Sequence, residues 1–391
     1  MAFFELDNDF ESGVDIRVFG VGGGGNNALN HMIASNIKGV EFVAVNTDRQ
    51  ALARCGVAKK ICIGENETTK GNGAGADPLK GAKAAEESAE EIMAAMQGAD
   101  MIFIATGMGG GTGTGAGPVV ARIAREMGIL TVGIVTKPFK FEGPRRMAQA
   151  EDGIAEISKY VDSLVIIPNE RLKEVSEQKI TLMNAFAIVD DILKHGIKSI
   201  TDTINYTGVI NLDFADVTEI MKDAGLAHMG IGEAKGENNV VEAAKRAIAS
   251  PLLETSIEGA SGILINFTVG PDVSLDETDE AATLVTQESS PNANIIWGIN
   301  VDESLGDEVK VTIIATGFEK KKVRIIAPTE EIRIGAKATK QIDNVDDEIK
   351  ISPAKRVSYN DSYNDPSIDE ILNIVNKNRQ RPVINTEDDQ Y

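Results

Sequence analysis

Two glycine-rich segments of this sequence have the composition expected of loops that bind phosphate groups. The first is GVGGGGNN, from Gly20 to Asn27, and the second is GGGTGTG, from Gly109 to Gly115. Each follows an apolar stretch and precedes a helical pattern, which places backbone N–H groups at a helix N-terminus, where an anion is stabilised. Because glycine has no side chain, a ligand can approach these N–H groups closely. The sequence therefore predicts a phosphate site built from backbone donors.

The two segments differ in how closely they specify the ligand. The first contains GxGxxG at Gly20, Gly22 and Gly25, a pattern that by itself also suits a nicotinamide-dependent oxidoreductase. The second adds hydroxyl groups to its run of backbone donors, which favours a di- or triphosphate. No GxxxxGKS or GxxxxGKT motif occurs, so the chain is not a P-loop nucleotide hydrolase. The oxidoreductase stays the alternative, although Asp48 in VNTD matches the ribose-binding acidic position of that class poorly.

One short segment, GVINLDFADV, brings an amide and two carboxylates together at Asn211, Asp213 and Asp216. Phosphoryl transfer to water requires positioned donors, a counter-charge and an oriented water molecule. The glycine segments supply only the donors, so this segment is the candidate source of the acidic groups. Asp213 also stands where a helix begins, and helix capping is an equally weighted explanation of that residue.

The elements that would hold these residues follow from the pattern of apolar side chains. Short apolar strands alternate with helices as far as SLVIIPN, which indicates an α/β fold with a Rossmann-like parallel sheet covered on both faces. ADPLKGAKAAEESAEEIMAAMQGA is predicted to be one helix, with Pro78 near its first turn. Apolar residues at three- and four-residue spacing predict a long central helix from Thr181 to Ile204.

After the central helix the pattern predicts a second, smaller α/β domain. It comprises helices near Val217 to Asp223 and Val240 to Ala249, followed by the strands GILINFTVG, ANIIWGINVD and EVKVTIIATGF. Beyond Phe318 the sequence is charged and rich in Asn and Asp, which predicts a disordered C-terminal tail. The predicted division is a nucleotide-binding domain at 1–180, a central helix at 181–207, a C-terminal domain with the acidic segment at 208–318, a flexible linker at 319–365 and a partner-binding tail peptide at 366–391.

The composition excludes several classes of partner. With 60 acidic and 39 basic residues the formal net charge is −21, which disfavours binding to nucleic acid or to anionic lipid. No apolar run approaches the roughly 20 residues that span a bilayer, and the first residues are acidic where a signal peptide would be basic. The protein is therefore predicted to be cytoplasmic, without direct membrane insertion. Cys55 and Cys62 match no common zinc spacing, and no protein-borne metal site is predicted.

Taken together, the motifs resemble the tubulin and FtsZ superfamily, and in particular the bacterial cell-division GTPases of the FtsZ family. GGGTGTG is the signature loop of that superfamily, and GVGGGGNNALNHMI and NLDFADV are similar to FtsZ sequences. The resemblance covers about Ile16 to Phe318. It implies that the chain binds GTP, hydrolyses it to GDP and phosphate, and takes up Mg²⁺ together with the phosphates.

The same resemblance assigns roles to individual residues. The phosphate cradle would consist of Gly22, Gly23, Gly24, Gly25, Asn26, Asn27, Gly109, Gly110, Gly111, Thr112, Gly113, Thr114 and Gly115. The contacts to the ribose and to guanine would come from Asn46, Glu142, Arg146, Asn169, Phe186 and Asp190. Pro144 is a departure, because the family usually has Arg or Lys directly after FEG.

In the family, the acidic segment enters the nucleotide site of a neighbouring subunit. Asp213 and Asp216 would then orient the attacking water, with Asn211 close to the nucleotide. A head-to-tail contact of two different faces does not close, so it would propagate a homopolymeric filament, which in this family forms the ring at the division site at mid-cell. A relative that binds nucleotide without turnover is the remaining alternative, and the presence of these three residues argues against it.

The end of the chain carries a further pattern, in PSIDEILNIVNKNRQRP. Four apolar residues at helical spacing precede a basic end; they are Ile368, Ile371, Leu372 and Val375. Such a segment could fold into a groove on a partner, and the resemblance implies membrane adaptors and regulatory division proteins. It departs from the family's D-I-P-x-F-L-R peptide, and chance periodicity in a frayed terminus is the alternative explanation.

Overall fold

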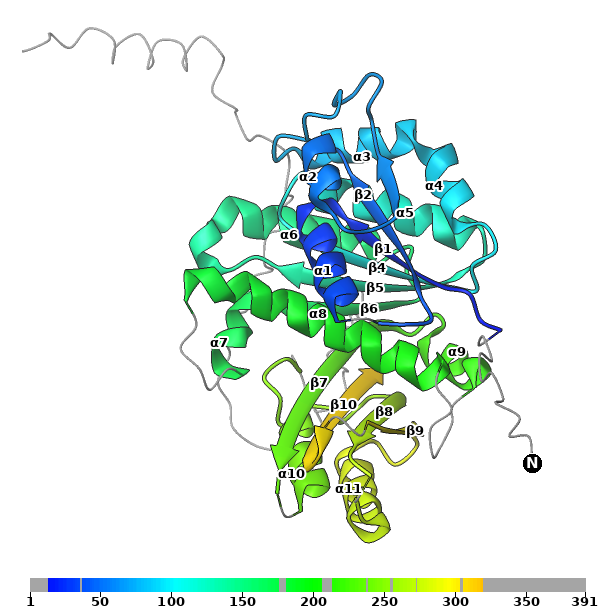
Figure 1. Cartoon of the computed structure of the whole chain (residues 1–391), viewed down its shortest axis with the longest axis vertical. Helices are drawn as coiled ribbons and strands as arrows, with labels where there is room; N and C mark the ends of the chain where they lie inside the picture. Colours follow the sequence, from blue (N-terminus) through cyan, green and yellow to red (C-terminus); the bar gives the residue numbers. More distant parts are fainter. Residues whose placement is uncertain are drawn as a thin grey trace, which may run out of the picture. The chain divides into compact units, whose positions relative to one another are not determined.

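A computed structural model of the chain describes residues 13–35, 37–175, 181–205, 213–236, 238–253, 256–271, 273–302 and 305–318. Its first half is built on six parallel strands in the order β3-β2-β1-β4-β5-β6 (Figure 1). β1 lies between two neighbours, so that Ile16 pairs with Met101 and Arg17 pairs with Glu41. The strands are β1 (Ile16–Val21), β2 (Glu41–Asn46), β3 (Lys59–Cys62), β4 (Met101–Gly107), β5 (Leu130–Lys137) and β6 (Ser163–Pro168).

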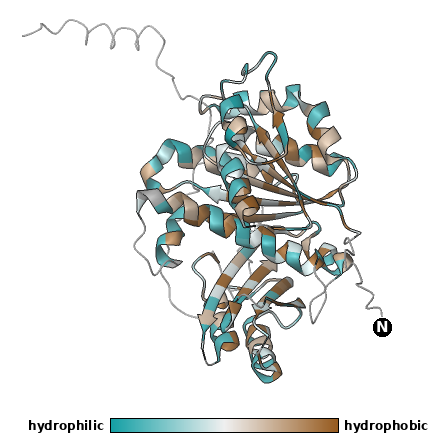
Figure 2. Cartoon of the chain, viewed as in Figure 1, coloured by the Kyte–Doolittle hydropathy of each residue, from teal (hydrophilic) through white to brown (hydrophobic). Residues whose placement is uncertain are grey.

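Both faces of this sheet are covered by helices, as the sequence predicts. Alternate residues of β1 enter two separate apolar clusters, with Val18 on one face and Phe19 on the other. The cluster on Val18 receives α1 and α8, and the cluster on Phe19 receives α3, α4, α5 and α6. In Figure 2 the strands are mostly hydrophobic, whereas the helices carry hydrophilic residues as well. The helices are α1 (Gly22–Ala34), α2 (Arg49–Arg54), α3 (Pro78–Glu87), α4 (Ala89–Met96), α5 (Thr112–Glu126), α6 (Pro144–Ile157), α7 (Leu172–Val175) and α8 (Leu182–Asn205).

The prediction of a single helix after Ala76 is wrong, because the structure has two helices, α3 and α4, that meet at Ser88. The Ser88 hydroxyl accepts a hydrogen bond from Gly64 N at 3.1 Å. The neighbouring Glu87 carboxylate accepts bonds from the backbone N–H groups of residues 66, 67 and 68, at 3.0, 3.0 and 3.1 Å. The break thus places two side chains where they satisfy the backbone of the loop after β3.

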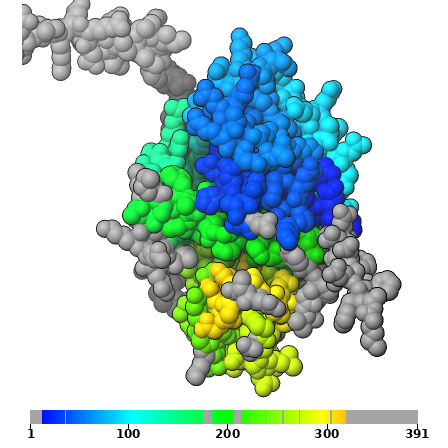
Figure 3. All heavy atoms as spheres, in the orientation of Figure 1, coloured from blue at the N-terminus to red at the C-terminus, as the bar shows by residue number. Residues whose placement is uncertain are grey.

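The second half of the described chain continues the same sheet. β7 pairs in parallel with β6 over three residues and antiparallel with β10, and the order then runs β7-β10-β8-β9. Figure 3 shows the surface of this part, in yellow-green and yellow, below the green band to which α8 belongs. Its elements are α9 (Phe214–Met221), β7 (Gly225–Lys235), α10 (Asn239–Ile248), β8 (Gly262–Val269), α11 (Leu275–Glu288), β9 (Asn294–Val301) and β10 (Glu308–Thr316).

The sequence pattern predicts neither β7 nor α11. β7 reads GLAHMGIGEAK, and glycine is depleted in strands because it contributes no side-chain packing. Two of these glycines meet α10, since a Cβ atom on Gly230 or Gly232 would collide with the carbonyl oxygens of Ala247 or Ala243. The residues that weaken the strand signal are therefore those that let α10 approach the strand.

Several predictions fall outside the described residues. They are Asn211, the linker at 319–365 and the tail peptide at 366–391. Among the described helices, none combines the length and apolar character that a membrane crossing requires. The division of the chain into domains stays a prediction.

Candidate functional site

The two glycine segments meet at one edge of the sheet. α1 starts directly after β1 and α5 starts shortly after β4, and these strands are parallel neighbours, so their carboxyl ends lie side by side. Neither helix has a capping side chain at its N-terminus, and neither has an acidic residue in its first turn. The first N–H groups of a helix have no partner within the helix, and the helix dipole makes this end positive. Two such ends therefore face one location that favours an anion.

Some glycines of this site are required by close packing. Gly22 has φ +74°, and a Cβ atom on it would lie 2.8 Å from the backbone nitrogen of Gly113. A Cβ on Gly25 or Gly115 would collide with the carbonyl oxygen of Ala105 or Pro78. Gly22, Gly25 and Gly113 hold the two helix starts against β4 and against each other, and Gly115 lets α5 approach α3.

Other glycines face open space. A Cβ atom on Gly23 or Gly110 would meet no atom of the described residues within 4 Å. Neither residue has the positive φ that would by itself require glycine, whereas Gly109, with φ +97°, does. Packing and backbone conformation thus leave both Gly23 and Gly110 unexplained, although each belongs to one of the two glycine segments.

Buried asparagine and threonine side chains fix the loops. Asn46 Nδ2 donates to Asn26 Oδ1 at 2.7 Å, and Asn26 Nδ2 donates to Gly20 O at 2.7 Å. The hydroxyl of Thr114 accepts from Gly109 N at 2.8 Å. The polar atoms of these three side chains form hydrogen bonds within the protein, so the side chains position the loops. Asn27 is exposed on α1.

The structure adds a third loop, residues 69–77, that sequence analysis missed. Gly73 N donates to Thr47 O at 3.0 Å, and the hydroxyls of Thr47 and Thr112 are hydrogen-bonded at 2.7 Å. A Cβ atom on Gly111 would lie 2.8 Å from Asp77 N, so this loop packs directly against the second glycine segment. The available signal was the glycine run GNGAG within it.

Glu142 and Arg146 form an ion pair at 2.5 Å near the start of α6. Glu142 Oε1 also accepts from Phe139 N at 3.0 Å, so the carboxylate is held while the guanidinium stays half-exposed. Pro144, the departure from the family sequence, is the first residue of α6, where a missing N–H is tolerated. The altered residue is therefore compatible with the start of the helix.

A cluster of aromatic rings lies exposed near these residues. Phe141 and Phe186 are 59% and 45% exposed, with ring centroids 6.5 Å apart and planes nearly perpendicular. The buried ring of Phe139 contacts both, at centroid distances of 5.3 and 5.6 Å. Phe186 is among the site residues predicted from the sequence, whereas Phe141 is not. Exposed rings supported from below offer flat apolar faces to a planar ligand.

Two buried polar groups of the predicted base site have no strong partner within the part of the chain that the structure describes. Asn169 Oδ1 is buried and has no hydrogen-bond partner among the described residues. Burial raises the pKa of the Asp190 carboxyl to about 7, and His31 Nε2 lies 3.7 Å from its Oδ2 atom. A buried acceptor without a donor is destabilising, so both groups fit a ligand that brings N–H donors.

The acidic segment lies at the opposite edge of the sheet. The Ser163 hydroxyl, at the first residue of β6, donates to Met221 O at the end of α9 at 2.6 Å. Ser163 also pairs with Gly225, the first residue of β7. The glycine loops instead follow the last residues of β1 and β4, which run parallel to β6. Because β1 spans six residues, at about 3.3 Å each, the two edges are about 20 Å apart.

Asp213 and Asp216 form a capping box on α9. Asp213 Oδ1 accepts from Asp216 N at 2.8 Å, and Asp216 Oδ2 accepts from Asp213 N at 3.3 Å. The capping explanation of Asp213 is thus confirmed. Both carboxylates nevertheless reach solvent, since Asp213 is exposed and Asp216 is half-buried. No group of three or more His, Cys, Asp or Glu side chains within the described residues could hold a metal ion.

Comparison with known proteins gives consistent matches over both halves of the chain. Residues 15–177 match the family model described as Tubulin/FtsZ family, GTPase domain, and residues 225–319 match FtsZ family, C-terminal domain. An empty FtsZ dimer from M. jannaschii is 45% identical, with a TM-score of 0.75, and the match covers 78% of this chain and 89% of that one. A mutant FtsZ from the same organism is 44% identical, with the same TM-score, covering 78% of this chain and 91% of that one.

A more distant match shows the shared fold alone. CetZ2 from Haloferax volcanii, in a GTPgS-bound protofilament, is 20% identical with a TM-score of 0.68, and the match covers 79% of this chain and 95% of that one. The M. jannaschii neighbours are archaeal, so the similarity does not establish the expected bacterial origin.

Proposed function

Because this chain belongs to the Tubulin/FtsZ family of GTPases, we propose that it holds GTP at the joined glycine loops and hydrolyses it where a second copy supplies the acidic segment. Family membership confirms the predicted GTPase activity and supports polymerisation. The observation that carries the proposal is the separation of the two halves of the site, which lie at opposite edges of one sheet, about 20 Å apart.

The phosphates fit the location in front of α1 and α5. Two uncapped helix ends supply backbone donors, and the open space at Gly23 and Gly110 leaves room for the ligand. We assign phosphate contacts to the backbone of residues 22–27 and 109–115, with the Thr112 hydroxyl beside them. Mg²⁺ would enter with the phosphates, since it is commonly held by substrate oxygens and water. When bound, it would neutralise charge that develops during phosphoryl transfer.

Guanine fits the buried acceptors and the exposed rings. Asn169 and Asp190 offer oxygens without strong donors, and the ring of Phe186 offers a stacking face. An ionised Asp190 can accept both N1–H and N2–H of guanine, which adenine cannot provide, so the site would favour GTP over ATP. We assign Glu142 and Arg146 to the ribose and the base side, and we place Asn46, whose amide holds Asn26, at the border of the ribose and the phosphates.

Catalysis would require two copies in a head-to-tail arrangement. The acidic segment of one copy, with Asn211, Asp213 and Asp216, would meet the glycine loops of the next. Asp213 and Asp216 would hold the attacking water, and their capping box would keep both carboxylates in place. Because such a contact joins two different faces, each copy leaves one face free and the assembly grows as a filament.

The cellular role belongs to the same proposal. We propose that the filament forms the cytokinetic ring at the division site in the cytoplasm, as the FtsZ membership suggests. We further propose the division at 1–180, 181–207, 208–318, 319–365 and 366–391, with the last segment binding membrane adaptors and regulatory division proteins. The chain's negative charge agrees with the absence of nucleic acid among these partners.

Phosphate release measured across protein concentration tests the interface mechanism. With saturating GTP, the rate per molecule should rise from near zero above a threshold concentration, because each complete site needs two copies. Light scattering on the same samples should rise at the same concentration. A rate per molecule that stays constant down to very dilute protein would refute hydrolysis at the interface.

A further inference from the structure

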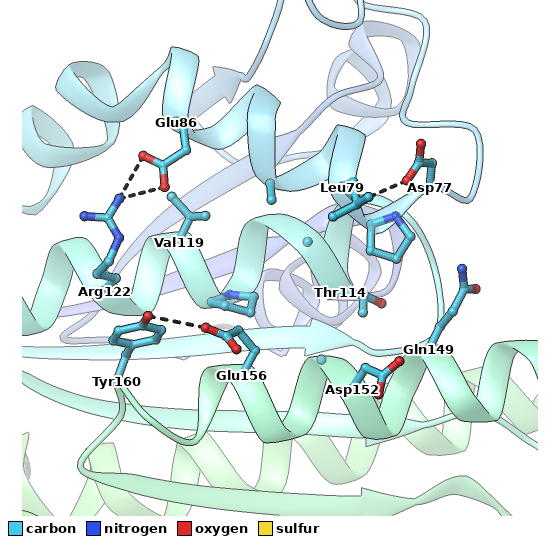
Figure 4. A pocket seen from close by; sticks show the side chains of 15 residues that line it. Asp77, Leu79, Glu86, Thr114, Val119, Arg122, Gln149, Asp152, Glu156 and Tyr160 are labelled. Atoms are coloured by element: carbon cyan, nitrogen blue, oxygen red, sulfur yellow. Dashed lines mark hydrogen bonds and ion pairs between the residues drawn. The ribbon is translucent and has the colours of Figure 1, made fainter. Parts of the chain in front are cut away.

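A groove separate from most of the candidate site lies between α3 and α6, with α5 as its floor (Figure 4). Its volume is about 560 Å³, within the range of sites that bind drug-sized groups. The apolar lining comes from Pro78, Leu79 and Ala82 on α3 and from Pro118 and Val119 on α5. The proposed function does not use these apolar residues.

The rim of this groove is acidic. Four carboxylates, those of Asp77, Glu86, Asp152 and Glu156, line it together with Arg122, and Lys159 pairs with Glu156 at 2.5 Å. Arg122 is already engaged, because it donates two hydrogen bonds to Glu86 at 2.8 Å and one to Glu126 at 2.7 Å. Asp152 is exposed on α6 and has no partner among the described residues. Of the four rim carboxylates, Asp77 and Asp152 therefore have no cationic partner among the described residues.

A large apolar side chain stands exposed at the same rim. Leu79, in the first turn of α3, is 82% exposed. The Asp77 carboxylate holds this turn in place by accepting from Leu79 N at 3.0 Å. An exposed leucine beside an apolar groove provides apolar contact area for a partner, and its exposure to water is unfavourable.

We propose that this groove is a docking site for a basic amphipathic helical segment of a partner protein. Apolar side chains of that segment would enter between α3 and α6, and its Lys or Arg residues would face the acidic rim, which is the charge complementarity that this mode of binding uses. α3 has ten residues and is about 15 Å long, which matches two to three turns of a docked helix. The unpaired carboxylates of the rim disfavour nucleic acid as the occupant.

The groove also touches the supports of the second glycine loop. Thr114 lines the groove and accepts from Gly109 N at 2.8 Å. Gln149, on α6, donates to Ala76 O at 3.3 Å, within the loop that packs on Gly111. Docking would therefore act on the loops to which we assign the phosphates, and this coupling rests on the proposed function.

A designed peptide tests docking without reference to GTP turnover. The probe is a fluorescent helical peptide of about 14 residues, with Leu at i, i+3, i+4 and i+7 and Lys at both ends. Its binding to the full chain without nucleotide is followed by fluorescence anisotropy. The pair of substitutions Leu79→Ser and Asp152→Lys should weaken binding about tenfold, because one apolar contact and one charge contact are lost. Glu90→Lys, an exposed charge reversal on α4 outside the groove, should leave affinity within about twofold.

Three outcomes would overturn the assignment. The first is equal affinity for the wild-type chain and the double variant, and the second is equally tight binding of a peptide with Glu in place of Lys. The third is a lower sedimentation coefficient for the double variant than for the wild-type chain, both measured without nucleotide and without peptide. The groove would then be a contact between copies of the chain. In the same samples, the affinity of the chain for a fluorescent GTP analogue should change at least about twofold when the peptide is bound. Unchanged affinity would refute the coupling, whereas failure to bind GTP at all would instead refute the proposed function.

Discussion

Replacing Asp190 with asparagine removes a carboxyl group that burial makes difficult to ionise. Burial raises its pKa from 3.8 to about 7, so the folded chain binds this proton more tightly than the unfolded chain does. The stability contributed by the protonated group is therefore complete below pH 3.8 and is lost as the pH rises to about 7. A pKa difference of this size corresponds to about 4 kcal/mol. His31, 3.7 Å away, makes this figure an upper bound.

Asp190→Asn should therefore stabilise the nucleotide-free chain in a pH-dependent manner. Above about pH 7 the variant should be more stable by up to about 4 kcal/mol, and near pH 4 the difference should disappear. GTP binding should respond in the opposite direction. The amide offers an N–H group to guanine where a carboxylate would accept, so the variant should lose its preference for GTP over ATP.

The wild-type chain should show a matching pH dependence of nucleotide affinity. Between about pH 8 and pH 6 the ionised fraction of Asp190 falls about tenfold, and GTP affinity should fall by a similar factor while ATP affinity stays constant. Denaturant unfolding and titration calorimetry measure the two effects. Asp152→Asn, at an exposed carboxylate, serves as the control and should change neither. Equal unfolding free energies of wild type and Asp190→Asn at every pH, or GTP affinity independent of pH, would refute this reasoning.

Gly110→Leu should abolish GTP binding but leave the chain folded, because its side chain would occupy open space that we assign to the phosphates. Gly111→Leu should instead lower the melting temperature, because its side chain would collide with Asp77. Nucleotide titration and thermal melts distinguish the two variants. Asp213→Asn should bind GTP normally but release phosphate at least about tenfold more slowly, since asparagine caps a helix as well as aspartate without its charge. A mixture of Asp213→Asn and Gly110→Leu should release more phosphate than the sum of the two variants measured separately. If the two variants associate and phosphate release does not increase, Asp213 acts in the site of its own subunit. Phe186→Ser should raise KM for GTP several-fold at constant kcat, through loss of stacking; a fall in kcat alone would contradict this role.

Local patterns in the sequence determined the frame of this protein. Glycine runs after apolar strands predicted phosphate loops followed by helices, and alternating strands and helices predicted the parallel sheet, because both signals depend on neighbouring residues. The structure begins these helices within the glycine runs, at Gly22 and Thr112. The family, the GTPase activity and the α/β fold, each expected from the sequence, are confirmed. The long helix predicted at Thr181 to Ile204 is present as Leu182–Asn205.

Contacts between residues distant in sequence decided the rest. The glycine-rich strand β7 forms because β6 and β10 pair with it and α10 packs on it, which its own composition does not reveal. Ser88 interrupts a helix-forming sequence because the loop after β3 needs its hydroxyl. Phe141 joins the candidate site only through its place beside Phe186.

In the candidate site, too, the sequence predicted some features and tertiary packing decided others. Residue types predicted which loops carry backbone donors, but only the packing distinguishes Gly111, which presses on Asp77, from Gly110, which faces open space. The sequence likewise identified Asp213 without showing that α9 lies at the amino edge of the sheet. A short motif encodes its own backbone conformation, whereas the distance between two motifs depends on the order of strands, and that order arises from tertiary packing.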